Sequence, residues 1–319
     1  MFKHLLVGVS LLGFGISASA ADFPTQPIEI VVPYAAGGVA DNIARHIAKN
    51  MTEDLDQSVV VINKPGGNTV IGTDWVLKSK ADGHKVLMVT NTNAVLNPLI
   101  YSDLPYDTDE ELQVINVNFA APLVLLANND MPFSNVSELK AYSDENPGKL
   151  NYSSASATGP LSLTVERLKR ALDFDMEPIA YSGGNPALMA VMAGDVEVGI
   201  DAFSGSMASI KAGKVKALAV TSDERLQVMP EIPAASETVP DFVGSVWYGF
   251  AVHSDTDNEI QQALHDAINR AAANPELVEM LINQGLIVFE GMGPEEITTM
   301  IESEKVDFAA IIEELDIKL

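Results

Sequence analysis

The chain has 319 residues, no cysteine, and 44 acidic against 19 basic residues, which gives a formal net charge of −25. A charge of this sign disfavours nucleic acid and anionic membrane surfaces as partners. The lack of cysteine excludes disulfides, thiol catalysis, cysteine-ligated zinc and a lipid anchor on cysteine. Because 47% of the residues are hydrophobic, a large core is available, and the length suggests two lobes.

The N-terminus has the three parts of a secretory signal peptide. A basic start precedes an apolar stretch from Leu5 to about Ile16, and Ala18-Ser19-Ala20 then offers an A-x-A cleavage site. The apolar stretch is shorter than the roughly 20 residues that span a bilayer, so a retained membrane helix is the weaker interpretation. We therefore expect residues 1–20 to be removed on secretion.

The next part of the chain alternates short β-branched runs with helical periodicity, which is typical of a mostly parallel sheet with helices on its faces. Ile43, Ile47 and Met51 recur every four residues, so one face of the first helix should pack on the sheet. In chain order the sequence predicts a strand at 28–32, a helix at about 40–53, a strand at 59–62, a helix at about 71–80 and a strand at 86–89.

A second series of strands and helices begins at the apolar run 122–127, after which Asn135 is predicted to cap a helix. The strands expected in this series lie at about 150–153, 177–181, 196–201 and 215–221. The proline-rich stretch 229–240 is predicted to be a long loop. The remainder is predicted to be helical, at about 259–273, 275–284 and 294–315.

Five small, polar turns, most of them rich in glycine, follow predicted strands. They are residues 33–41, 63–69, 90–93, 153–160 and 181–186. In an open α/β sheet the carboxyl ends of the strands border the ligand crevice. Glycine allows a close backbone approach, and helix N-termini present N–H groups with partial positive charge. One such turn alone is more often only a turn, but five at corresponding places suit a carboxylate ligand.

The candidate ligand-binding residues come from these turns and from the neighbouring strand ends. They are Tyr34, Ala36, Gly37, Gly38, Gly67, Asn68, Thr69, Thr90, Asn91, Ser154, Ser156, Ala157, Thr158, Gly159, Tyr181, Gly183, Gly184, Asp201 and Phe203. Hydroxyls and amides predominate, so hydrogen bonds rather than an arginine clamp should neutralise a bound anion. We expect Lys64, in the second turn, to point to solvent, and Arg45 to form a surface ion pair.

Asp201 ends a predicted strand at the same edge as the glycine-rich turns. Two interpretations stay open: it caps the following helix, or its carboxylate faces the crevice. In the second case it would repel a carboxylate and accept an ammonium or hydroxyl group. Tyr34, Phe203 and Trp247 are either walls for an apolar ligand body or core residues.

Sequence signatures of nucleotide binding and catalysis are absent. The chain contains no G-x-x-x-x-G-K-[ST], no G-x-G-x-x-G and no G-x-S-x-G, and its five histidines lack metal-ligand spacing. We expect no catalytic residue, no cofactor and no metal site. The acidic runs 107–111 and 255–259 are predicted to cap helices, since Ile260 stands where a calcium loop needs glycine.

A series of motifs in the order expected resembles the periplasmic solute-binding proteins of tripartite tricarboxylate transporters, the Bug family. The matching pieces are spread over essentially the whole chain after residue 20. They include 27–34 (PIEIVVPY), 63–66 (NKPG), 71–73 (IGT), 104–107 (LPYD), 147–152 (PGKLNY), 181–183 (YSG), 210–214 (IKAGK), 217–222 (ALAVTS) and 247–249 (WYG).

The resemblance implies a type II periplasmic-binding-protein fold, an α/β fold with a ligand cleft between two lobes joined by crossover segments. We place the first lobe at residues 21–121 plus 248–319 and the second at residues 122–247. The resemblance also implies that second-lobe turns at 154–159 and 183–184 grip a carboxylate. Turns at 36–38 and 67–69 of the first lobe would face them, partly through water.

The function expected on this basis is capture of a small mono- or dicarboxylate in the periplasm by lobe closure. The protein, a monomer, would deliver it to the membrane permease subunits of a tripartite tricarboxylate transporter. One alternative is a sensory adaptor that presents its ligand to a membrane receptor. The other is a secreted enzyme on the same fold, which would need a nucleophile with a paired base.

Overall fold

The computed structural model describes residues 23–155 and 158–317. The predicted signal peptide, residues 1–20, lies outside this part of the chain, as do residues 156–157. None of the helices in the described ranges combines the length and the apolar character needed to cross a membrane.

The first of two connected sheets is built from β1 (Ile28–Val32), β2 (Val59–Asn63), β3 (Lys85–Thr90), β4 (Leu112–Ala127), β9 (Ser245–His253) and β10 (Ile287–Val288). Its order is β2–β1–β3–β9–β4, and β10 pairs with the other side of β4. β1 is parallel to β2 and β3, whereas β9 is antiparallel to β3 and β4.

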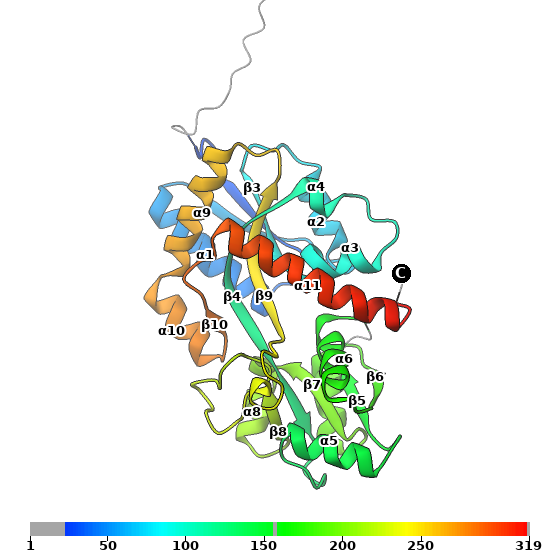
Figure 1. Cartoon of the computed structure of the whole chain (residues 1–319). Helices are drawn as coiled ribbons and strands as arrows, with labels where there is room; N and C mark the ends of the chain where they lie inside the picture. The colour runs from blue at the N-terminus through cyan, green and yellow to red at the C-terminus, as the bar shows by residue number, and fades with distance from the viewer. Residues whose placement is uncertain (1–22, 156–157, 318–319) are drawn as a thin grey trace, which may run out of the picture.

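The second sheet contains β5 (Asn151–Ser154), β6 (Glu177–Ala180), β7 (Val198–Ala202) and β8 (Lys216–Val220) on either side of the far half of β4. β7 and β8 pair antiparallel with β4, and β5 is parallel to β6 and β7. β4 therefore carries the chain from one sheet to the other, and β9 returns beside it. Figure 1 shows the two α/β lobes joined by these strands, which confirms the predicted fold class.

Helices cover both faces of each sheet. The first lobe has α1 (Val39–Leu55), α2 (Val70–Leu77), α3 (Asn97–Ile100), α4 (Thr108–Glu111), α9 (Asn258–Ala272), α10 (Pro275–Asn283) and α11 (Pro294–Glu314). The second has α5 (Val136–Glu145), α6 (Pro160–Leu172), α7 (Gly184–Ala193) and α8 (Phe203–Lys211).

The predicted stripe on α1 packs as expected, since Ile43, Ile47 and Met51 are fully buried together with Leu264 of α9. On the opposite face of the first sheet, α11 contributes Phe308 and Ile311 to a second apolar cluster. Leu163 of α6 belongs to that same cluster. α11 therefore packs partly on the first lobe and partly on the second, as Figure 1 shows.

Four segments differ from the sequence prediction. β9 (Ser245–His253) lies where the sequence predicted no strand. The strand predicted at 122–127 is the end of β4, which begins ten residues earlier at Leu112. The chain from Thr92 to Ile100 is helical, first as a π-helical turn and then as α3. Ile287 and Val288 form a short strand between two predicted helices. Both predicted lobe boundaries fall inside the crossover strands, and that division of the chain stays a prediction.

Candidate functional site

The carboxyl ends of β3 and β7 point toward the crossover from opposite sides. Thr90, the last residue of β3, lies opposite Tyr248 of β9, which is paired with Phe119 of β4. Ala202, the last residue of β7, lies opposite Leu123 of β4. These two levels are four residues apart on β4, about 13 Å at about 3.3 Å per residue. Turns from both lobes therefore flank the crossover strands.

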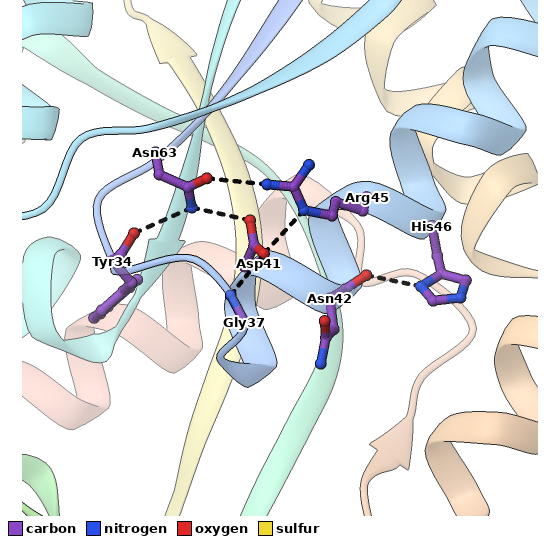
Figure 2. A network of polar contacts seen from close by, with 7 residues as sticks. All are labelled: Tyr34, Gly37, Asp41, Asn42, Arg45, His46 and Asn63. Carbon is purple, nitrogen blue, oxygen red and sulfur yellow. Dashed lines mark hydrogen bonds and ion pairs between the residues drawn. The ribbon is translucent and has the colours of Figure 1, made fainter.

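The first turn, between β1 and α1, is organised by Asp41, as Figure 2 shows. Its carboxylate accepts hydrogen bonds from the Gly37 N–H at 2.8 Å and from Asn63 Nδ2 at 2.9 Å, and it forms an ion pair with Arg45 Nε at 2.9 Å. Burial would raise the pKa of Asp41, but the hydrogen bonds from Arg45, Gly37 and Asn63 outweigh it and lower that pKa. The turn is thus held by a carboxylate that stays ionised.

Arg45 of α1 and Lys64 of the second turn both have partners of their own. Arg45 forms the predicted ion pair, with Asp41, and its Nη2 also donates to Asn63 Oδ1 at 3.1 Å. The ammonium of Lys64 lies 4.1 Å from the ring centroid of Trp75, a cation–π contact that keeps the side chain half-buried. The expectation that Lys64 points to solvent is therefore wrong, because the indole attracts its charge.

The second turn contains two residues in the left-handed region, Asn68 at φ +49° and Thr69 at φ +78°. A β-branched residue is strained there, so the surroundings must hold it. Asn97 does this: its Nδ2 donates to Asn68 O at 2.8 Å and to Thr69 Oγ1 at 3.1 Å, and its Oδ1 accepts from Asn68 Nδ2 at 2.9 Å. Asn68 and Gly67 are exposed, whereas Thr69 is buried.

The third turn, at the end of β3, is buried, and Asn91 Oδ1 in this turn accepts no hydrogen bond from the described residues. Tyr34 OH and Thr90 Oγ1 are 2.7 Å apart, so this contact joins the first turn to the third. Burial raises the pKa of Tyr34, and hydrogen bonding to Thr90 and Thr92 opposes the shift only in part. Asn91 Nδ2 donates to Ser245 O at 2.8 Å, which ties the end of β3 to the start of β9.

The fourth turn leads from β5 into α6. Ser154 is buried, and its Oγ accepts a 2.7 Å hydrogen bond from Ser162 Oγ. Gly159 precedes α6 with no side-chain cap on the helix. Thr158 and Gly159 are half-buried. The predicted site residues Ser156 and Ala157 lie outside the described residues.

The fifth turn contains Tyr181, Gly183 and Gly184, and Gly184 lies beside Asp201. The N–H of Tyr181 donates to Ser154 O at 2.8 Å, and Gly183 has φ +135°, a conformation essentially restricted to glycine. A Cβ on Gly184 would lie 2.8 Å from Oδ1 of Asp201. The fourth and fifth turns therefore meet at one edge of the second sheet, with the Asp201 carboxylate against the start of α7.

Asp201 is 8% exposed and accepts hydrogen bonds from the Ala202 N–H at 2.9 Å and Ser206 Oγ at 2.6 Å. Burial raises the pKa of this carboxyl, and the two hydrogen bonds oppose the shift only in part. Both donors belong to the start of α8. These two contacts therefore agree with the interpretation that Asp201 caps this helix. Whether the carboxylate also faces a ligand stays a prediction.

The aromatic candidates differ in their surroundings. Phe203 is fully buried in an apolar cluster of the second lobe, and a Cβ on Gly285 of the first lobe would lie 2.3 Å from its ring. Trp247 is buried as well, and its Nε1 donates to Glu304. Phe203 and Trp247 are thus both packed in the core of the structure. Tyr34 is half-buried at the edge of the first turn.

Three supporting residues escaped the list of candidates: Asp41, Asn63 and Asn97. Each forms two or more hydrogen bonds to a turn that the sequence did single out. The signals for Asn97 are the density of asparagine in residues 91–97 after a strand and the Asn97-Pro98 pair, which also matches the family that the sequence resembles. The partners are up to 29 residues apart, so their pairing requires the folded sheet.

Hollows of about 470 Å³ between α4 and α11 and of about 400 Å³ beside the start of α5 lie outside these turns, and so do two others. One, of about 610 Å³, is bordered by α5, α6 and α11 and includes Lys169 and Glu314. The other, of about 380 Å³, lies between the loop after β8 and the segment around β10, with Arg225 and Phe289 in its wall. Arg225 is paired with Glu237 at 2.6 Å. Neither hollow is lined by a candidate ligand-binding residue.

The sequence profile of the tripartite tricarboxylate transporter family receptor, TctC, matches residues 43–317. A protein of Pseudomonas sp. (strain P51), described as the UPF0065 protein in the tcbD-tcbE intergenic region, is 32% identical over 98% of this chain and 94% of its own length. Protein BugT of Bordetella pertussis (strain Tohama I) is 29% identical over 98% of this chain and 97% of its own.

Solved structures of similar proteins share this fold. R. palustris Rpa4515 with adipate is 25% identical with a TM-score of 0.78, over 93% of this chain and 99% of that one. MatC from Rhodopseudomonas palustris with bound malate is 26% identical with a TM-score of 0.74, over 91% and 100%. The chain therefore belongs to the tripartite tricarboxylate transporter receptor family, the Bug family of periplasmic solute-binding receptors.

Proposed function

We propose that this receptor captures a small mono- or dicarboxylate between the turns of its two lobes and delivers it to the permease subunits of a tripartite transporter. The capture takes place in the periplasm, after removal of residues 1–20, and the lobes close on the ligand. No bond is made or broken in this function.

The observation that carries the proposal is a difference between two groups of helices. α1, α2, α6 and α7 begin after strand carboxyl ends near the crossover, and none of them has a side-chain cap. α4, α5, α9 and α10 begin elsewhere, and each is capped by its own Asp or Asn. α3 and α11 also begin elsewhere, and their cap residues, Leu96 and Gly293, supply no side-chain cap. Uncapped N–H groups with a partial positive charge are suited to a ligand carboxylate.

The charge of the protein supports this mode of binding. With a net charge of −25 the chain repels anions at long range, so an anion must be held by local donors. Arg45 and Lys64 are engaged with Asp41 and Trp75, which leaves binding to backbone N–H, hydroxyl and amide groups. Hydrogen bonds of this kind favour reversible capture over an arginine clamp.

The comparisons support the ligand class. Two related receptors are described with adipate and with malate, both of them carboxylates. The division into a lobe of residues 21–121 plus 248–319 and a lobe of 122–247 is part of the same proposal. It places the β1, β2 and β3 turns on one side of the ligand and the β5, β6 and β7 turns on the other.

A thermal-shift screen tests the proposal directly. Mono- and dicarboxylates, neutral sugars and divalent metal ions would be added separately to the purified mature protein. A ligand at about 100 times its Kd stabilises the folded state by about 2.7 kcal/mol, which raises the Tm measurably. We expect a shift with a carboxylate, and small-angle scattering should then show a smaller radius of gyration. Shifts with sugars or metals only would rule the proposal out.

A further inference from the structure

The hollow of about 380 Å³ lies between two segments that belong to different sheets. One wall is the loop 222–228 after β8, and the other is the chain from Ile282 near the end of α10 to Phe289 after β10. Ala120 of β4 and Ser245 of β9 also border the hollow. It therefore lies next to the crossover strands, away from the turns that are proposed to hold the carboxylate.

The walls of this hollow are mainly apolar and are open to solvent. Six of the lining side chains are apolar and partly exposed, namely Val228, Val243, Ile282, Ile287, Val288 and Phe289. Single exposed apolar residues are ordinary, but a group of them gathered in a concave place marks a site of interaction. The volume is within the range of about 300–1,000 Å³ that small-molecule sites occupy.

Hydrogen bonds within the protein hold both walls in place. In the loop after β8, the buried Ser222 donates through its Oγ to Glu224 O at 2.6 Å. In the opposite wall, the Phe289 N–H donates to Asn118 O at 2.8 Å, and β10 is paired with β4. A site with walls that are already ordered binds a ligand without the cost of ordering them.

The uncompensated charges beside the hollow are negative. Asp223 and Glu224 line it, both are exposed, and neither forms an ion pair within residues 23–155 and 158–317. Arg225 lines it as well, but its guanidinium donates hydrogen bonds of 2.6 and 2.7 Å to Glu237, which compensates its charge. An apolar hollow beside two free carboxylates favours a cation and disfavours an anion.

We propose that this hollow is a second ligand site, separate from the carboxylate-binding turns, and that it takes a small apolar molecule with an ammonium group. The apolar body contacts Val243 from one side and Phe289 from the other. The ammonium group lies toward Asp223 and Glu224. Because the two walls belong to different sheets, a bound molecule also fixes their relative position. Its binding is thereby coupled to lobe closure, and this coupling, unlike the binding itself, rests on the proposed function.

A displacement assay on the purified mature protein tests the ligand class. The probe is N-phenyl-1-naphthylamine, an uncharged aromatic compound whose fluorescence rises in apolar surroundings. The competitors are 4-phenylbutylamine, 4-phenylbutanol and 4-phenylbutyrate, which share one apolar body. We expect the amine to bind about threefold more tightly than the alcohol, because exposed charge pairs contribute modestly, and the acid to bind most weakly. Equal affinity of the three competitors, or no displacement by any of them, overturns the proposal.

Variants locate the site in the hollow. Val243→Lys puts a charge on the apolar wall and should weaken probe binding about fivefold or more. Val60→Lys is the matched control, since Val60 is 41% exposed and Val243 40%, and Val60 lies on β2, outside the hollow. It should leave probe binding unchanged, and equal losses in the two variants overturn the assignment. Asp223→Asn combined with Glu224→Gln should lower the affinity of the amine to that of the alcohol.

Calorimetry tests the coupling. The Kd of the best carboxylate of the thermal-shift screen would be measured with and without saturating 4-phenylbutylamine. We expect the amine to change that Kd about fivefold, and the carboxylate to change the Kd of the amine by the same factor. An unchanged Kd overturns the coupling. Binding of no carboxylate overturns the proposed function, while the displacement assay still decides whether the second site exists.

Discussion

The indole Nε1 of Trp247 donates a 2.9 Å hydrogen bond to a carboxylate oxygen of Glu304. The bond joins the crossover strand β9 to α11, the helix that packs on both lobes. Arg167 of α6 is the nearby positive group, and Asp307 lies one helical turn beyond Glu304. The contact between α11 and the rest of the protein therefore contains a half-buried carboxyl whose charge depends on pH.

Burial raises the pKa of Glu304 to about 7, while the bond from Trp247 and the charge of Arg167 oppose the shift. Because the folded state holds this proton more tightly than the unfolded state, its contribution to stability is complete below about pH 4.5 and is lost as pH rises through 7. The contribution is at most about 3 kcal/mol.

Glu304→Gln should flatten the change of Tm between pH 5 and 8. Glu302→Gln, a substitution at an exposed neighbour, should leave this change of Tm as it is in the wild type. An identical pH profile for wild type and Glu304→Gln would contradict the assignment.

Arg167 connects the second lobe to α11 and to the loop before β9. Its Nη1 donates to Val243 O at 2.9 Å, its Nη2 pairs with Asp307 at 3.2 Å, and its guanidinium lies 5.9 Å from the Phe308 ring centroid. Arg167→Met should lower the free energy of unfolding by about 1–2 kcal/mol and speed amide exchange in α11. Urea denaturation and hydrogen exchange measure the two effects.

Arg170 provides the matched control for this contact. Its pair with Glu314 is 3.5 Å long, and both side chains are more than half exposed. Arg170→Met should therefore change stability by less than about 0.5 kcal/mol. Equal effects of the two substitutions would show that Arg167 contributes no more than an ordinary surface pair.

Asp41 is predicted to be the most sensitive residue of the first turn. Asp41→Ala leaves the Gly37 N–H, Asn63 and Arg45 without their acceptor, which should cost about 2–4 kcal/mol in the free energy of unfolding. The same change should weaken ligand binding, because the turn loses its geometry. Arg45→Met should cost less, since half of that side chain is exposed. Chemical denaturation and calorimetry would show the order, and a larger cost for Arg45→Met would refute it.

Two glycines allow backbone strain to be separated from binding. Gly183 has φ +135° and Gly148 has φ +71°, and a Cβ on either would meet no atom within 4 Å. Replacement by alanine should therefore act through the backbone alone and cost about 1–3 kcal/mol at each position. Only Gly183→Ala should also weaken carboxylate binding, because Gly148 lies in the turn before β5, away from the crossover. Comparable losses of affinity in both variants would place the site elsewhere.

The turns could be predicted because glycine, hydroxyl and amide residues follow β-branched runs at regular places. The contacts that hold these turns could not. Asn116 and Asn118 interrupt the apolar pattern of β4, and the strand is recognisable only once both amides are seen to donate to Asn269 Oδ1 of α9, about 150 residues away. For this reason the start of β4 escaped prediction. Local patterns indicate elements, whereas long-range amide pairs become visible only in the fold.

Phe203 and Asp201 show the same limit at the site itself. The sequence left Phe203 open as a wall or a core residue, and the structure adds that it is fully buried against Gly285 of the other lobe. For Asp201 it left open a cap or a crevice residue. The structure adds two flanking glycines, Gly184 and Gly205, and the lack of a described cationic partner, neither of which follows from the spacing of residues along the chain.

The most direct test of carboxylate capture is a calorimetric comparison of a dicarboxylate with its own diamide. The two have nearly the same shape, and only the acid carries the negative charges that uncapped helix N-termini stabilise. The wild-type protein should bind the best acid of the screen and show no measurable heat with its diamide. Equal affinity for the two compounds, or binding of the diamide alone, would contradict the account.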